Sequence, residues 1–94
     1  MAKMMHGKRY NLVLYQYDSC PFCAMVRNYL EQNNVRVPMK DTLMDPAARR
    51  ELIQIGGKAQ VPCLTINGAP LYESRDIIEW VRENIVELKP IPSV

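Results

Sequence analysis

The chain has 94 residues, of which 48% are hydrophobic, and a formal net charge of +2. This length suits one globular domain rather than two, and the hydrophobic fraction suffices for a core without disulfide bonds. The small charge and the scattered basic residues argue against nucleic acid as a partner. No apolar run approaches the ~20 residues that cross a bilayer, so we expect no membrane partner.

We expect residues 10–88 to form the folded domain, with residues 1–9 as a flexible leader and residues 89–94 as a loose tail. The leader is charged but lacks the apolar stretch of a secretory signal. The three cysteines, two of them in a C-x-x-C pair, do not fit the disulfide framework of a small secreted protein. We therefore expect a cytoplasmic protein, acting as a monomer, in which such a pair is catalytic or binds a metal.

The first half of the chain predicts a strand, a helix and a second strand. Residues 12–15 form a continuous apolar run, typical of a strand buried on both faces. After a break at residues 17–19, Pro21 suits the first position of a helix that extends to residue 32. The alternating residues 35–40 predict a half-exposed strand, which Pro38 places at an edge of the sheet.

The second half begins with a helix and continues with a hairpin. Asp45 followed by Pro46 is the pattern of an N-cap with proline at the first helical position, and the glycines at 56–57 stop this helix. The segments 64–66 and 70–72 flank Asn67-Gly68, a pair that favours a two-residue type I′ turn.

Ser74 is expected to cap a last helix. Its buried stripe would consist of Ile77, Val81 and Ile85. The resulting order is β-α-β-α-β-β-α, and its first half must be a right-handed unit with parallel strands. We therefore predict an α/β protein with a thioredoxin-like fold, in which three helices cover a four-stranded mixed sheet.

The C-x-x-C pair, Cys20-Pro21-Phe22-Cys23, lies between the buried strand and the start of a helix. The first turn of a helix has unpaired N–H groups and a partial positive charge, which stabilise a thiolate placed there. Cys20 would therefore be the nucleophile in disulfide exchange. Cys23 lies one turn further along the same face and is more buried, so it would resolve the mixed disulfide.

Two structural alternatives remain for this pair. Both cysteines could be core residues, or they could form half of a zinc site. Zinc would need two further ligands, and only Cys63 and His6 remain to supply them. The strand–turn–helix context favours redox chemistry over both alternatives.

The chain resembles the glutaredoxins, and among them those similar to the N-terminal domain of glutathione transferases, over residues 10–88. The motifs that carry the resemblance are LYQYDSCPFC at 14–23, GG at 56–57, QVPCL at 60–64, the NG turn, and YESRDIIEWV at 72–81. The resemblance implies that Cys20 and Cys23 are the catalytic dithiol and that Pro62 follows a cis peptide bond. It also implies a glutathione site in which the backbone of Val61 pairs with the cysteinyl part of glutathione. The implied holders of the γ-glutamyl end are Glu73 and Ser74.

The implied function is that of a glutathione-dependent thiol–disulfide oxidoreductase. Glutathione would be its co-substrate, with no metal, and its partners would be disulfide-containing or glutathionylated proteins. Exposed Phe22 would form an apolar rim beside the pair. Tyr17, also assigned to the glutathione site, stands where many glutaredoxins have a lysine. The candidates to supply the missing positive charge are Arg27 and Lys58.

Two further departures concern the residues around Val61-Pro62. Gln60 replaces the threonine that many glutaredoxins have there, and Cys63 follows the proline directly. We expect Cys63 to be a small buried hydrophobic residue rather than a redox-sensitive thiol. The rival functions are a thioredoxin-like electron donor that ignores glutathione, a metal or iron–sulfur module, and a glutathione-conjugating transferase, for whose second domain 94 residues leave no room.

Overall fold

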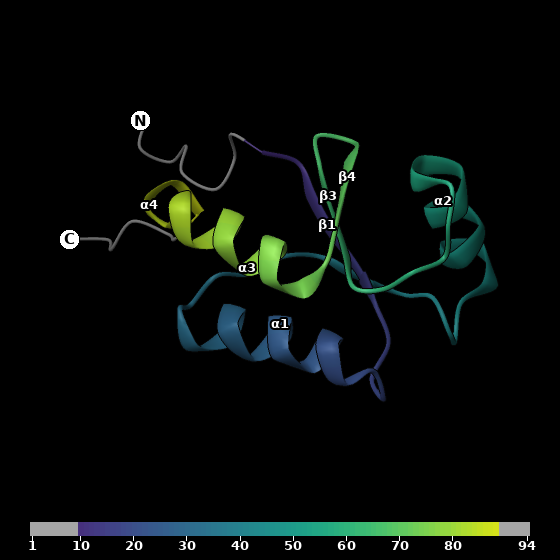
Figure 1. Ribbon diagram of the computed structural model, residues 1–94, viewed down its shortest axis with the longest axis horizontal. Helices are drawn as coiled ribbons and strands as arrows, with labels where there is room; N and C mark the ends of the chain where they lie inside the picture. The colour runs from purple at the N-terminus through teal and green to yellow at the C-terminus, as the bar shows by residue number, and fades with distance from the viewer. Residues whose placement is uncertain (1–9, 89–94) are drawn as a thin grey trace.

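The computed structural model describes residues 10–88, so the expected leader and tail lie outside the described residues. The elements are β1 (Leu12–Gln16), α1 (Pro21–Gln32), β2 (Met39–Asp41), α2 (Pro46–Gly56), β3 (Cys63–Ile66), β4 (Ala69–Tyr72), α3 (Ser74–Glu83) and α4 (Ile85–Leu88) (Figure 1). No helix within residues 10–88 is long and apolar enough to cross a membrane.

The four strands form one mixed sheet in the order β2-β1-β3-β4. β1 pairs with β2 in parallel, and the other two pairings, β1 with β3 and β3 with β4, are antiparallel. The parallel pair requires the crossover through α1, whereas the antiparallel pair β3–β4 needs only a tight turn. This is the predicted thioredoxin-like arrangement.

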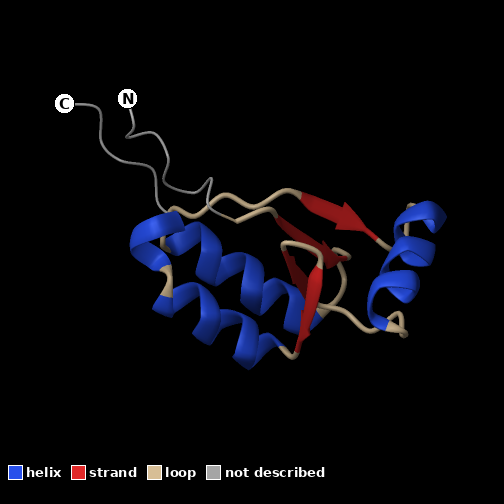
Figure 2. Cartoon of the chain, turned by 90° about the horizontal axis from the view of Figure 1, so that it is seen from above, coloured by secondary structure: helices blue, strands red, loops and turns tan. Residues whose placement is uncertain are grey.

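The predicted burial of β1 on both faces is confirmed. Leu14 packs with α1 and α3 in one core cluster, and its neighbour Tyr15 packs with Leu52 of α2 in a second one. Adjacent residues of a strand point to opposite faces, so β1 contributes to both cores. Accordingly, α1 and α3 lie together on one face of the sheet and α2 lies on the other (Figure 2).

The helix starts and the hairpin turn follow the local rules. Pro21 and Pro46 are the first residues of α1 and α2, and the Asp45 side chain accepts the Ala47 N–H at 3.0 Å. In the hairpin turn, Asn67 and Gly68 have φ values of 52° and 87°. Positive φ at both central residues is the mark of a type I′ turn, as predicted.

The strand expected at residues 35–40 is shorter and begins later. Val35 and Val37 are buried, which explains the alternation, but the ladder with β1 begins only after Pro38, whose carbonyl accepts the Leu14 N–H at 2.9 Å. β2 is an edge strand, as Pro38 predicted. Pro70 lies in β4, the opposite edge strand. Both edges therefore carry a proline, which cannot donate to a ladder.

The last helix differs from the prediction at both ends. Its N-cap is Glu73 and not Ser74, which is the first helical residue. Its C-cap is Asn84, whose side-chain amide donates to the Trp80 carbonyl at 2.8 Å and whose Oδ1 accepts from the Tyr10 hydroxyl at 3.2 Å. These bonds compete with helix continuation. Ile85 therefore lies in α4 and is only partly buried, so the structure has four helices within residues 10–88 instead of three.

Gly56, the last residue of α2, provides a test of the packing between α2 and β4. A Cβ atom at Gly56 would overlap the Tyr72 hydroxyl and would lie 2.7 Å from Tyr72 Cζ. Helix propensity favours alanine over glycine by about 1 kcal/mol, but overpacking costs about 1–3 kcal/mol. We expect Gly56→Ala to lower the free energy of unfolding, measured by urea denaturation. Tyr72→Phe removes the nearest clashing atom, so the cost should be smaller in that background. Equal costs in both backgrounds would contradict the packing argument.

Candidate active site

The turn between β1 and α1 holds Cys20 at the N-cap of α1. Its backbone is extended, with φ −83° and ψ 115°, and its Sγ accepts the Cys23 N–H at 3.1 Å. Its side chain is largely buried, with 6% of its surface exposed. The sulfur atom thus occupies the position in which a capping side chain satisfies an unpaired N–H of the first helical turn. A thiolate formed there would receive a charge-assisted hydrogen bond.

Cys23 is the more deeply placed thiol of the pair. It has no exposed surface, and burial raises its pKa to about 12. The side chain of Cys20 raises this pKa further, whereas a backbone hydrogen bond at Tyr17 and the charge of Arg27 oppose the rise. Both cysteines of the pair are free thiols in the structure. The sequence-based expectation that Cys23 is the more buried of the two is confirmed.

A cavity of about 290 Å³ lies beside this turn. Its lining residues are Phe22, Gln60, Val61, Pro62, Glu73 and Ser74. The Val61–Pro62 peptide bond is cis, as the resemblance implied. Three segments that are distant in the sequence therefore meet here: the start of α1, the segment before β3, and the start of α3. Five of the residues assigned to the glutathione site line this one cavity.

Glu73 has an unusual backbone. Its φ is 75°, a value that non-glycine residues adopt at a cost, and such residues often occur at functional sites. Its carboxylate accepts a hydrogen bond from the Gln60 side-chain amide at 3.3 Å. Because Glu73 makes no side-chain cap to α3, the first N–H groups of that helix are not satisfied by it. An acid and a helix start therefore face the same cavity, which suits a ligand carrying both an ammonium and a carboxylate group.

Two other residues from the sequence analysis lie differently. Tyr17 does not line the cavity; its carbonyl accepts the Cys20 N–H at 3.3 Å and a hydrogen bond from Arg27 at 3.2 Å. Lys58 lies over the ring of Tyr72, with its Nζ 4.5 Å from the ring centroid. Gln60 also lines the cavity, although the sequence marks it only as a departure from the family pattern. Its place directly before Val61-Pro62 was the signal that could have assigned it to the site.

Cys63 is fully buried in β3, where it pairs with Tyr15 on one side and Tyr72 on the other. It belongs to the core cluster with Leu52, as expected of a small buried hydrophobic residue. Burial raises the pKa of this thiol to about 11. Within residues 10–88, no group of three or more His, Cys, Asp or Glu side chains is placed to hold a metal ion.

Comparison with known proteins identifies a family. The model of the family described as Glutaredoxin matches residues 12–70. Prostaglandin E synthase 2 of Danio rerio is 36% identical over 67 residues, which cover 71% of this chain and 17% of that protein. Prostaglandin E synthase 2 of Mus musculus is 30% identical over 97 residues, covering 99% of this chain and 24% of that protein. The chain thus spans less than a third of the length of these relatives.

Solved structures show the same fold. Glutathione transferase Omega 3C from Trametes versicolor has a TM-score of 0.71 and 25% identity, over 93% of this chain and 39% of that chain. A thioredoxin-like protein has a TM-score of 0.66 and 28% identity, over 77% of this chain and 96% of that chain. The buckwheat glutaredoxin–glutathione complex has a TM-score of 0.66 at 21% identity, over 93% of this chain and 83% of that chain, a likeness of fold alone.

The raised pKa of Cys63 predicts a loss of stability in alkali. Above the ordinary thiol pKa of 9.0, Cys63 loses its proton in the unfolded state, whereas in the folded state its pKa is about 11 and it keeps the proton. The folded state then binds more protons, so the free energy of unfolding falls as the pH rises through this window. We expect Cys63→Ala to reduce this slope. The comparison is between urea denaturation profiles of the two proteins across the window. Parallel profiles would show that Cys63 does not titrate as described.

Proposed function

The chain belongs to the glutaredoxin family, and we propose that it is a glutathione-dependent thiol–disulfide oxidoreductase acting through Cys20 and Cys23. Its substrates would be protein disulfides and mixed disulfides between proteins and glutathione. In this proposal it works as a monomer in the cytoplasm, where a reducing environment keeps the dithiol reduced. Glutathione is its co-substrate, and no metal takes part.

The observation that carries the proposal is the position of Cys20 at the helix start next to the cavity. Its thiolate would attack the glutathione sulfur of a mixed disulfide, forming a Cys20–glutathione disulfide and releasing the protein thiolate. A second glutathione thiolate can then attack that glutathione sulfur, which returns Cys20 to its thiolate and forms oxidised glutathione. Alternatively, Cys23 attacks the Cys20 sulfur, which forms the internal disulfide and releases reduced glutathione.

The cavity has groups that suit two parts of glutathione, its cysteinyl residue and its γ-glutamyl end. The backbone of Val61 would pair with the cysteinyl residue, which places the glutathione sulfur toward Cys20. The carboxylate of Glu73 would bind the γ-glutamyl ammonium, and the N–H groups at the start of α3, beside Ser74, would bind its carboxylate. Exposed Phe22 would supply an apolar wall. The buckwheat glutaredoxin of the same fold was solved with glutathione, which supports this assignment.

A second candidate is favoured by the relatives named prostaglandin E synthase 2. In such a protein this chain would form one domain, and its cavity would still hold glutathione. The experiment is an assay for prostaglandin E formation by the purified chain with glutathione present. Product formation that depends on Cys20 would favour this second candidate.

Substitution of the two cysteines tests the main proposal. Cys20→Ser should abolish reduction of every disulfide substrate, since a serine hydroxyl does not ionise near neutral pH. Cys23→Ser should keep glutathione-dependent removal of glutathione from small mixed disulfides and lose the dithiol reduction of protein disulfides. The first activity is measured by the consumption of reduced glutathione. The second is measured by the oxidation of the reduced chain when it is mixed with a protein disulfide. Residual activity of Cys20→Ser, or equal loss of both activities in Cys23→Ser, would contradict the assigned roles.

The double variant Glu73→Ala, Ser74→Ala tests the glutathione site and distinguishes the main proposal from the thioredoxin-like alternative. A charge-assisted hydrogen bond is worth about 1.5–3 kcal/mol, and exposure reduces that value. We therefore expect the glutathione concentration at half-maximal rate to rise about tenfold, since about 1.4 kcal/mol corresponds to that factor. Glu83→Ala, an exposed acid at the far end of α3, is the matched control. An unchanged glutathione requirement in the double variant would place the site elsewhere.

A further inference from the structure

Arg27 ties α1 to the end of β1 and to the active-site turn. Its Nη1 donates to the side-chain oxygen of Gln16 and, at 3.2 Å, to the Tyr17 carbonyl; its Nη2 donates to the Asp18 carbonyl at 3.2 Å. The guanidinium thus binds three consecutive residues that precede Cys20. A planar group with five donors can hold such a set, whereas an ammonium group cannot hold all three in the same geometry.

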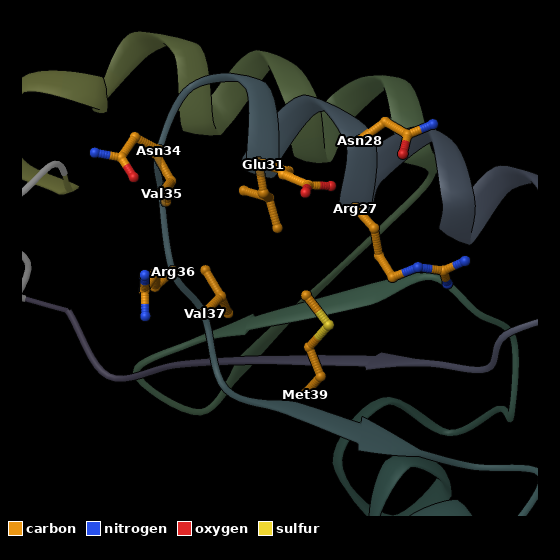
Figure 3. A pocket seen from close by; sticks show the side chains of 9 residues that line it. Arg27, Asn28, Glu31, Asn34, Val35, Arg36, Val37 and Met39 are labelled. Atoms are coloured by element: carbon orange, nitrogen blue, oxygen red, sulfur yellow. The ribbon is translucent and has the colours of Figure 1, made fainter.

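The side chain of Arg27 points toward the active-site turn. Arg27 and Arg36 both line a hollow of about 520 Å³ between α1 and the segment leading to β2 (Figure 3). The guanidinium of Arg27 points out of this hollow toward the beginning of α1, whereas Arg36 stands on the opposite side (Figure 3). Arg36 is exposed. The two arginines therefore share a charge and a hollow but differ in their relation to the active-site turn.

We propose that Arg27 is a positioning residue for the resolving step: it holds the turn before Cys20 in place and keeps a positive charge near Cys23. The proposal rests on the function proposed above. Cys20 depends less on Arg27, because α1 itself fixes it through the Cys23 N–H to Sγ and the Ala24 N–H to its carbonyl at 2.9 Å. Tyr17 stands where many glutaredoxins have a lysine. In the structure, the guanidinium of Arg27 binds the backbone carbonyl of Tyr17 and brings a positive charge to this turn.

The resolving step needs such help. In it, the Cys23 thiol loses a proton, and its thiolate attacks the Cys20 sulfur of the Cys20–glutathione disulfide. The Cys20–Cys23 bond forms, the bond to glutathione breaks, and the glutathione thiolate leaves and takes up a proton. Burial opposes the first event because it raises the pKa of Cys23.

Arg27 counters this effect in two ways. Its charge lowers the pKa of Cys23, and its bonds to the Tyr17 and Asp18 carbonyls hold the turn in which a backbone hydrogen bond of Tyr17 also lowers that pKa. Within residues 10–88, the titratable or charged side chains that act on Cys23 are Cys20 and Arg27. Loss of Arg27 should therefore move the pH profile of the resolving step to higher pH.

The experiment separates the two steps. Fully reduced protein is mixed with oxidised glutathione and quenched at intervals, and intact mass follows the glutathione adduct and then the internal disulfide. In Arg27→Gln we expect an unchanged rate of adduct formation and a resolving rate lowered several-fold, because the pKa of Cys23 rises when the charge is lost. Arg27→Lys, which keeps the charge but loses part of the hydrogen bonding, should give an intermediate resolving rate. Arg36→Gln, with the same change in charge, is the matched control and should behave like the wild type.

Three outcomes would overturn the proposal: a wild-type resolving rate in Arg27→Gln, an equal slowing of both steps, or the same effect in Arg36→Gln. If Arg27→Gln does not fold, as judged by its thermal melt, Arg27→Lys decides, and a wild-type resolving rate in it overturns the positioning role. Failure of the proposed function would give a different result: neither the wild type nor any variant would form a glutathione adduct on Cys20.

Discussion

The hydrogen bond from the Cys23 N–H to the Cys20 sulfur joins the fold to the chemistry of this protein. It requires a strand to end and a helix to begin within four residues, with the first sulfur at the N-cap and the second one turn along the buried face. The end of β1 is held in place on both sides, by β2 and by β3. The helix can begin there because Pro21 needs no N–H partner. The cavity is positioned by the same constraint, since Phe22, one of its lining residues, lies in the first turn of α1.

The sequence predicted those parts of the fold that depend on neighbouring residues. Asp45-Pro46 marked the start of α2, and Asn67-Gly68 marked the hairpin turn, because each pattern satisfies its geometry locally. The continuous apolar run of β1 predicted burial on both faces. The C-x-x-C pattern between a strand and a helix predicted the two cysteines of the site. The cavity came from the resemblance to a family, since residue pattern alone does not bring Phe22 and the Val61–Pro62 pair together.

Features that depend on tertiary contacts were not predictable. Nothing in the sequence signals that Glu73 adopts a positive φ, which places the N-cap at Glu73 rather than at Ser74. The helix break at Asn84 depends partly on the Tyr10 hydroxyl, 74 residues away in the chain. The bonds of Arg27 to the carbonyls of the active-site turn depend on how α1 lies against the end of β1. The sequence indicates only that Arg27 is one of two candidates to supply the missing positive charge.

The prolines at the two edges of the sheet also bear on how the molecule meets other polypeptides. Exposed edge strands favour the addition of a foreign strand and so promote aggregation. Here Pro38 precedes one edge strand and Pro70 lies within the other, so each edge presents a backbone that is incomplete as a hydrogen-bonding template. An extended peptide that approaches the sheet therefore meets poor pairing along both flanks.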